Sequence, residues 1–141
     1  MLLRRVLVID DDPYLPRVLE LSLAPISDLK FQYATTGQQG LQLAEADPPD
    51  LILLDYAMPE MDGLETLRRL RANQRTARTP IAAITGILRT SRRCAEMIAG
   101  CDACLPKPFD FAALRRVVGR LLPRRQPATT GGRAGGSGRS I

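Results

Sequence analysis

The sequence predicts an α/β fold in which five strands form one parallel sheet with helices on both faces. Short apolar runs alternate along the chain with stretches that have helical spacing, and this alternation predicts a (βα)₅ arrangement. The runs are apolar at nearly every position rather than at every second one. Continuous apolar strands are typical of parallel sheets that are buried on both sides.

The expected strands are short and rich in Val, Ile and Leu. Residues 5–10 and 51–55 are the clearest, because each range contains four consecutive large apolar side chains. The second strand is assigned to the segment Phe31-Gln32-Tyr33-Ala34, whose aromatic residues favour strands. In chain order, we expect strands at residues 5–10, 31–34, 51–55, 80–84 and 103–105.

Each expected strand is followed by a helix that starts near a residue favoured at helix N-termini. Asp12 is expected to cap the first helix, with Pro13 at its first position. Asp62 and Asp110 are expected to cap the third and fifth helices, and Gly100 to end the fourth. The five helices are expected at residues 13–24, 36 or 37 to 46, 62–72, 90–99 and 110–121.

The strand order places several polar side chains at one edge of the sheet. Right-handed crossovers favour the doubly wound order 2-1-3-4-5, in which the first and third strands are neighbours. The first strand ends at Asp10 and Asp11, and the third ends at Asp55. Thr85 and Lys107 follow the fourth and fifth strands. All five side chains therefore lie at the carboxyl edge, where open α/β sheets bind ligands.

These residue types point to phosphoryl chemistry with a metal ion. Crowded carboxylates repel one another, and a hard cation such as Mg²⁺ relieves that repulsion. Asp10, Asp11 and Asp55 are the candidate ligands, and an aspartate can attack phosphorus as a nucleophile. The Lys107 ammonium and the Thr85 hydroxyl can bind phosphoryl oxygens. Helix capping or simple exposure to solvent would explain any one of these residues taken alone. Neither explains well why all five lie together at the carboxyl edge of the sheet.

Composition narrows the class of protein further. The 141 residues predict one domain, residues 1–122, and a disordered Arg/Gly/Ser-rich tail, residues 123–141. The net charge is +5, and the four tail arginines account for most of it, since 5 − 4 leaves +1 for the domain. A nearly neutral domain argues against a dedicated nucleic-acid surface.

The absence of certain residues and segments is also informative. The chain has no histidine, which excludes Ser-His and Cys-His nucleophiles and histidine metal ligands. It has no apolar run near the ~20 residues that span a bilayer, and no secretory signal, so we expect a cytoplasmic protein without membrane insertion.

Four motifs together resemble the receiver domain of two-component response regulators. They are the acidic pair in VLVIDDDP, the aspartate in LILLDYAMPEMDG, the hydroxyl in IAAITG and the lysine in LPKPF. The resemblance covers about residues 3–122, and the order and spacing of the motifs agree. It implies a flavodoxin-like fold with the strand order derived above.

The resemblance also implies residue roles. Asp55 is the phosphoacceptor, Asp11 binds Mg²⁺ directly, and Asp10 binds it largely through water. The backbone carbonyl of Ala57 is a further metal ligand. Thr85 and Lys107 engage the phosphoryl group. The family also implies a cis Lys107–Pro108 peptide bond, and a sensor histidine kinase or histidine phosphotransfer protein as phosphodonor.

The expected function is a signalling switch with intrinsic phosphorylation and dephosphorylation chemistry, not a turnover enzyme. Its output is expected through protein docking at the fourth helix, fifth strand and fifth helix, without direct DNA binding. The arginines expected on that face are Arg89, Arg92, Arg93, Arg115 and Arg116. The alternatives are a phosphate shuttle or sink in a phosphorelay, a constitutive adaptor and, from another class, a metal-dependent phosphatase.

One position departs from the family pattern. A Tyr or Phe that changes rotamer usually lies three residues before the lysine, whereas this chain has Cys104 there. A cysteine is too small to act as that switch, so the departure favours a different or weaker output and slightly favours the sink.

Two further patterns have unremarkable interpretations. Cys101 and Cys104 have the spacing of a redox or metal pair but lack further ligands, so small apolar packing is the expected role. A basic patch on and after the third helix is expected to be a solvated face. Its members are Arg68, Arg69, Arg71, Arg75 and Arg78.

Overall fold

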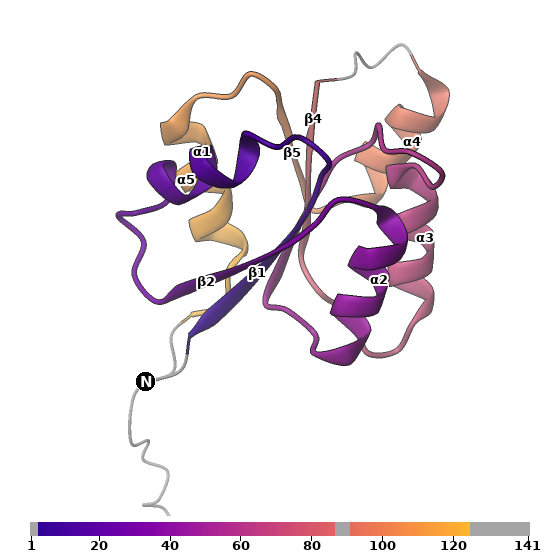
Figure 1. Ribbon diagram of the computed structural model, residues 1–141, viewed down its shortest axis with the longest axis horizontal. Coiled ribbons are helices and arrows are strands. Elements are labelled where there is room, and N and C mark those ends of the chain that lie inside the picture. The colour runs from indigo at the N-terminus through magenta and orange to yellow at the C-terminus, as the bar shows by residue number, and fades with distance from the viewer. Residues whose placement is uncertain (1–2, 87–90, 125–141) are drawn as a thin grey trace, which may run out of the picture.

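The computed structural model describes residues 3–86 and 91–124. Five parallel strands form one sheet in the order β2-β1-β3-β4-β5, which confirms the predicted fold class and strand order (Figure 1). Each strand lies within two residues of its predicted ends. The strands are β1 (Arg4–Ile9), β2 (Leu29–Ala34), β3 (Leu51–Leu54), β4 (Ile81–Thr85) and β5 (Ala103–Pro106).

The helices follow the strands as predicted, and most of their N-caps are the expected residues. The side chains of Thr36, Asp62 and Asp110 accept hydrogen bonds from backbone N–H groups in the first turns of α2, α3 and α5. Ser91 caps α4 in the same way, and Gly100 is the last residue of that helix. The helices are α1 (Leu15–Ser22), α2 (Gly37–Ala46), α3 (Gly63–Ala72), α4 (Arg92–Gly100) and α5 (Phe111–Leu121).

The prediction for the start of α1 was wrong. The helix begins at Leu15, its N-cap is Tyr14, and Pro16 rather than Pro13 lies in its first turn. Asp12 instead accepts a hydrogen bond from the Tyr14 backbone N–H at 2.9 Å and shapes a turn ahead of the helix. This local turn competes with helix capping, because the same side-chain oxygen serves either role.

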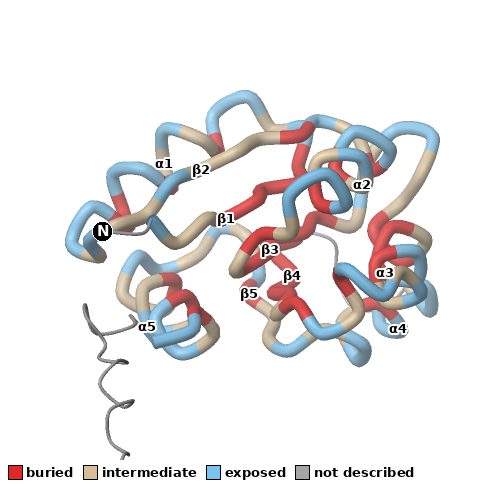
Figure 2. The backbone as a smooth tube through the Cα atoms, turned by 90° about the horizontal axis from the view of Figure 1, so that it is seen from below, coloured by how far each residue is buried: buried red, intermediate tan, exposed pale blue. Residues whose placement is uncertain are grey.

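The two faces of the sheet carry separate apolar cores. Helices α1 and α5 cover one face, and α2, α3 and α4 cover the other (Figure 1). Successive residues of β1 alternate between them, since Val6 and Val8 face the first group of helices and Leu7 and Ile9 the second. Buried positions concentrate along the central strands (Figure 2).

Burial along the strands follows their place in the sheet. Every residue of β3 and β4 is buried, as expected for central strands that are covered on both faces. Only Ala34 is buried in the edge strand β2, which explains why its sequence is the least apolar of the five.

Three further predictions concern the Lys107–Pro108 peptide bond, membrane insertion and the C-terminal tail. The Lys107–Pro108 peptide bond is cis, as predicted. Among residues 3–86 and 91–124, no helix has the length and apolarity needed to cross a membrane. The predicted disorder of the tail concerns residues 123–141, of which 125–141 lie outside the described residues, as does Arg89.

Candidate functional site

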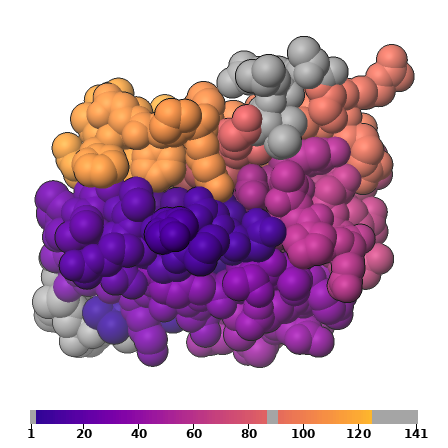
Figure 3. Space-filling view, turned by 45° about the horizontal axis from the view of Figure 1, so that its top comes forward, coloured from indigo at the N-terminus to yellow at the C-terminus, as the bar shows by residue number. Residues whose placement is uncertain are grey.

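Three carboxylates meet where β1 and β3 end. Ile9 and Leu54 are partners in the parallel register, so Asp10 and Asp55 follow at the same level of the sheet. The structure brings one oxygen each from Asp10, Asp11 and Asp55 within 4.8 Å of one another. Figure 3 turns this edge toward the viewer, where the N-terminal segment lies between the magenta β3–α3 region and the orange C-terminal region. Clustered carboxylate oxygens fit a hard divalent cation such as Mg²⁺.

Asp55 is one of two buried acids in the site, the other being Asp10. Its exposed fraction is 6%, and the Tyr56 backbone N–H donates to its Oδ1 at 2.8 Å. Burial, helped by the neighbouring charge of Asp10, raises the pKa of Asp55 to about 6. The Lys107 charge and hydrogen bonds from Tyr56 and the Thr85 hydroxyl oppose that rise.

Lys107 places its ammonium group among the acids. Its Nζ is 2.7 Å from Asp10 Oδ2, 3.9 Å from Asp12 Oδ2 and 4.0 Å from Asp55 Oδ2. Burial alone lowers the pKa of Lys107, but the Asp10 hydrogen bond and the nearby carboxylates outweigh it, so the net pKa is raised. The group is therefore a permanent cation at neutral pH, as binding of a phosphoryl oxygen requires.

Thr85 and Ala57 are the remaining predicted site residues. Thr85 is the last residue of β4, is 1% exposed, and accepts the Lys107 backbone N–H on its carbonyl oxygen at 2.9 Å. Its hydroxyl lies close enough to Asp55 to lower the pKa of that carboxyl. Ala57 is exposed in the loop after β3, two residues beyond Asp55. The predicted site residues on β1, β3, β4 and β5 thus converge on the Asp55 carboxylate.

Two contributors were missed by sequence reasoning. Asp12, interpreted only as a cap, donates its backbone N–H to Asp10 Oδ1 at 2.9 Å and adds a carboxylate near Lys107. The second is the contact between α3 and α4 behind Asp55, where Arg93 pairs with Asp62. Asp12 directly follows Asp10 and Asp11 in the sequence, and this position could have indicated that it belongs to the site. The contact between α3 and α4 has no local sequence signal.

The cysteines behave as the packing interpretation predicts. None of the three is in a disulfide bond. Cys101 and Cys104 are half-buried and pack against the core formed with α2, α3 and α4. Burial raises the pKa of the Cys101 thiol to about 12, which keeps it protonated and unreactive at neutral pH.

Most of the basic patch after α3 is paired. Three of its arginines form ion pairs with acids and a fourth donates to a backbone carbonyl, in agreement with a solvated, structural face. These contacts are Arg68 with Glu96, Arg69 with Glu65, Arg71 with Asp102, and Arg75 with the Glu45 carbonyl oxygen.

Comparison with known proteins identifies the family. The sequence matches the response regulator receiver domain over residues 6–119. This chain belongs to the response regulator receiver domain family. The match covers most of the folded part and includes the acids, the threonine and the lysine of the site.

Two curated relatives illustrate the similarity. The receiver domain is 35% identical over 120 residues to the DNA-binding dual master transcriptional regulator RpaA of Synechocystis sp., covering 85% of this chain and 49% of that protein. It is 37% identical over 123 residues to the response regulator MprA of Mycolicibacterium vanbaalenii, covering 87% of this chain and 52% of that protein. The chain therefore spans about half the length of these relatives.

Solved receiver structures share the fold. Chemotaxis protein CheY4 of Vibrio cholerae is 26% identical with a TM-score of 0.73, covering 85% of this chain and 99% of that one. The receiver domain of sensor histidine kinase PA1611 from Pseudomonas aeruginosa is 28% identical with a TM-score of 0.75, covering 84% and 97%, and has magnesium in its active-site cleft. Response regulator TrrA of Thermotoga maritima, 27% identical with a TM-score of 0.73, covers 85% and 100% and is in complex with Mg²⁺–BeF.

Proposed function

We propose that this receiver domain is a phosphorylation-dependent switch whose phosphoacceptor is Asp55. The phosphodonor is a sensor histidine kinase or a histidine phosphotransfer protein, and the reaction depends on Mg²⁺. The observation that carries the proposal is the convergence of Asp10, Asp11, Lys107 and the Thr85 hydroxyl on the buried Asp55 carboxylate.

The transfer follows from the chemistry of the groups present. An Asp55 carboxylate oxygen attacks the phosphorus of a phosphohistidine, a P–O bond forms, and the P–N bond breaks with its electron pair remaining on the imidazole, which takes up a proton. Asp10, Asp11, Asp55 and the Ala57 carbonyl would hold Mg²⁺, which neutralises charge on the phosphoryl oxygens. The Lys107 ammonium binds one oxygen of the phosphoryl group, and the Thr85 hydroxyl binds another.

The same groups limit the domain to a modest intrinsic chemistry. Water attack on phosphorus of the aspartyl phosphate restores the carboxylate and releases inorganic phosphate. Asp10 and Asp11 beside Asp55 are assigned to the metal, and residues 56–59, which directly follow Asp55, include no carboxylate that could act as a general acid for rapid turnover. We therefore propose a phosphoacceptor rather than a phosphatase, acting in the cytoplasm.

Output is proposed through protein docking at the α4, β5 and α5 face rather than through direct DNA binding. Arg92, Arg93 and Arg116 are exposed there, and Arg115 is half-buried with a hydrogen bond to the Ser22 carbonyl oxygen at 3.3 Å. Arg93 is already paired with Asp62, the N-cap of α3.

A phosphate shuttle or sink is the second candidate, and Cys104 favours it. This side chain is half-buried in β5 opposite Ala83 of β4, and its small volume provides no large moving group on the output face. A sink needs transfer chemistry but no difference in partner affinity.

Intact-protein mass spectrometry tests the proposed function. The chain is incubated with Mg²⁺ and a small-molecule phosphodonor, and we expect the mass to rise by one phosphoryl group. Asp55→Asn is the matched control, because Asn keeps the shape of the side chain but cannot form the acyl phosphate. Absence of the mass gain in the wild type, or a gain that persists in Asp55→Asn, would contradict the proposal and favour a constitutive adaptor.

A further inference from the structure

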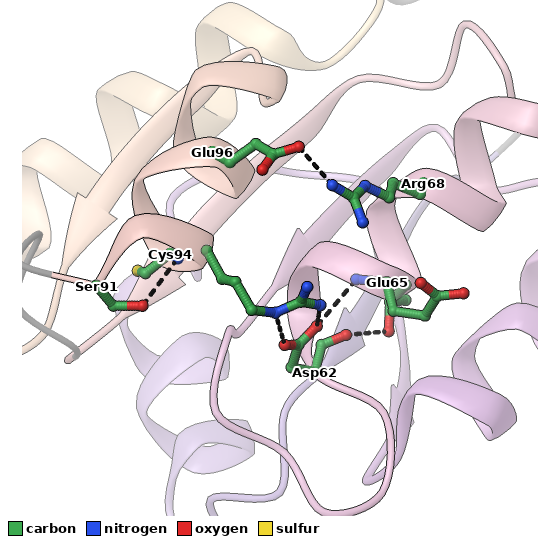
Figure 4. A network of polar contacts seen from close by, with 8 residues as sticks. Asp62, Glu65, Arg68, Ser91, Cys94 and Glu96 are labelled. Carbon is green, nitrogen blue, oxygen red and sulfur yellow. Dashed lines mark hydrogen bonds and ion pairs between the residues drawn. The ribbon is translucent and has the colours of Figure 1, made fainter.

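A bidentate ion pair joins the N-terminal ends of α3 and α4. Arg93 Nε is 2.8 Å from Asp62 Oδ2, and Arg93 Nη2 is 3.0 Å from Asp62 Oδ1. Asp62 is the N-cap of α3, and Arg93 is the second residue of α4. Figure 4 shows Asp62 facing a guanidinium group that extends from the neighbouring helix.

Helix α4 gains nothing by itself from an arginine at this position. A cation at a helix N-terminus opposes the helix dipole, and the first turn of α4 contains no acid. Asp62 offsets this cost from the neighbouring helix. Hydrogen bonding from Arg93 holds the pKa of Asp62 below its usual range, so the carboxylate is charged at any pH where the domain functions. The location of Arg93 is therefore explained by the pair and not by α4.

The Asp62 end of the pair is packed directly against the phosphoacceptor. The backbone N–H of Gly63 donates to the Tyr56 carbonyl oxygen at 2.8 Å, and the Tyr56 N–H donates to Asp55. A Cβ on Gly63 would clash with the Asp55 carbonyl oxygen and lie 2.7 Å from the Met97 Sδ of α4. The Asp55–Tyr56 backbone, the start of α3 and the middle of α4 are thus in contact.

Tyr56 connects the ion pair to the Asp55 carboxylate. Its backbone N–H donates to Asp55 Oδ1, and its carbonyl oxygen accepts the N–H of Gly63, the residue next to Asp62. The Tyr56 side chain also helps to lower the pKa of Asp62. A change in the hydrogen bonds of Asp55 therefore reaches the pair through a single residue.

A second ion pair between the same helices provides an internal comparison. Arg68 Nη2 is 2.5 Å from Glu96 Oε2, and both side chains are about half exposed, at 50% and 53% (Figure 4). The exposed fractions of Arg93 and Asp62 are 49% and 24%. The two pairs thus link α3 to α4, but only the Asp62–Arg93 pair includes the N-cap residue of α3, which precedes Gly63 beside Asp55.

We propose that the Asp62–Arg93 ion pair couples the loop that follows β3, which contains Asp55, to helix α4. The ion pair is formed in the unmodified chain and is broken when Asp55 carries a phosphoryl group. This inference rests on the proposed function. The phosphoryl group adds negative charge and new hydrogen-bond acceptors, which attract the N–H and hydroxyl donors that now bind the Asp55 carboxylate. The Tyr56 backbone shifts with Asp55, and its contact with the start of α3 no longer holds Asp62 in place to bind Arg93. Arg93 is then available, beside exposed Arg92, to bind a carboxylate of a docking partner.

The size of the expected effect is bounded. A coupling element shifts a two-state equilibrium only by the difference in its own free energy between the two states. A partly exposed ion pair therefore changes that equilibrium by about fivefold at most. Such a change alters the population of the docking-competent state without affecting whether the domain folds.

Hydrogen exchange of the α4 amides tests the coupling. It is measured for the wild type, Arg93→Gln, Asp62→Asn and Arg68→Gln, each with and without Mg²⁺ and beryllofluoride as phosphoryl mimic. Asn is as good an N-cap as Asp, so Asp62→Asn removes the pair while keeping the cap. We expect beryllofluoride to speed α4 exchange by about fivefold in the wild type and in Arg68→Gln. In Arg93→Gln and Asp62→Asn, we expect exchange of the α4 amides to be fast already without beryllofluoride and not to change when it is added.

The outcomes separate this inference from the proposed function. A wild type that binds no beryllofluoride at Asp55, with Asp55→Asn as reference, overturns both. A wild type that binds it while Arg93→Gln responds as strongly overturns only the coupling, as does a wild type whose α4 amides do not respond. Arg93→Lys, which keeps one charged contact, is expected to recover part of the response, and a purely structural role predicts no such recovery.

Discussion

At the scale of single residues, Asp55 ionises at an unusually high pH, and this has a measurable effect on stability. Burial raises its pKa to about 6, above the ordinary value of 3.8 that applies in the unfolded chain. The folded state therefore holds the proton more tightly, and its stabilisation is complete below the unfolded pKa and lost as pH rises through about 6.

We expect the free energy of unfolding in chelator-containing buffer to fall by about 2 kcal/mol between pH 4 and pH 7 because of Asp55. Urea denaturation at a series of pH values measures this fall. Asp55→Asn is expected to remove that component, and Mg²⁺ to reduce it, since a bound cation favours the ionised form. An Asp55→Asn variant with the same pH slope as the wild type would show that another group is responsible.

At the scale of elements, the sequence predicts what is local and misses what depends on packing. Strand order, most N-caps and the convergence of Asp10, Asp55 and Lys107 follow from apolar runs and one topological rule. The start of α1 was mispredicted because the Asp12 side chain stabilises either a turn or a helix cap. The pairing of Arg93 with Asp62 joins residues 31 positions apart through helix–helix contact, which no local pattern encodes.

Close approach of backbone atoms also leaves no room for a side chain at Gly63. Although Ala is the better helix former, Gly63→Ala is expected to destabilise the domain by about 1–3 kcal/mol, because the new methyl group meets backbone atoms of Asp55 and Tyr56 that cannot move aside. The midpoint of urea denaturation measures the change. Gly119→Ala in α5 is the matched control, since nothing lies within 4 Å of its Cβ, and it is expected to stabilise the domain by about 0.5–1 kcal/mol. Equal effects of the two substitutions would contradict this account of the packing.

At the scale of the whole molecule, the acidic edge links site occupancy to global stability. The three carboxylates directly follow β1 and β3, two neighbouring interior strands that contribute to both apolar cores, so a cation bound there is bound only by the folded chain. A ligand that binds only the folded state, present at ten times its Kd, adds about 1.4 kcal/mol to the free energy of unfolding.

We expect Mg²⁺ to raise the thermal midpoint accordingly, as measured by differential scanning fluorimetry across a Mg²⁺ titration. Asp11→Asn is the control, because Asp11 is exposed and its loss leaves both cores intact while removing one ligand. An equal rise in Asp11→Asn would place the cation elsewhere on the surface. No rise in the wild type would mean that Lys107, already 2.7 Å from Asp10, balances the acids well enough to exclude the metal.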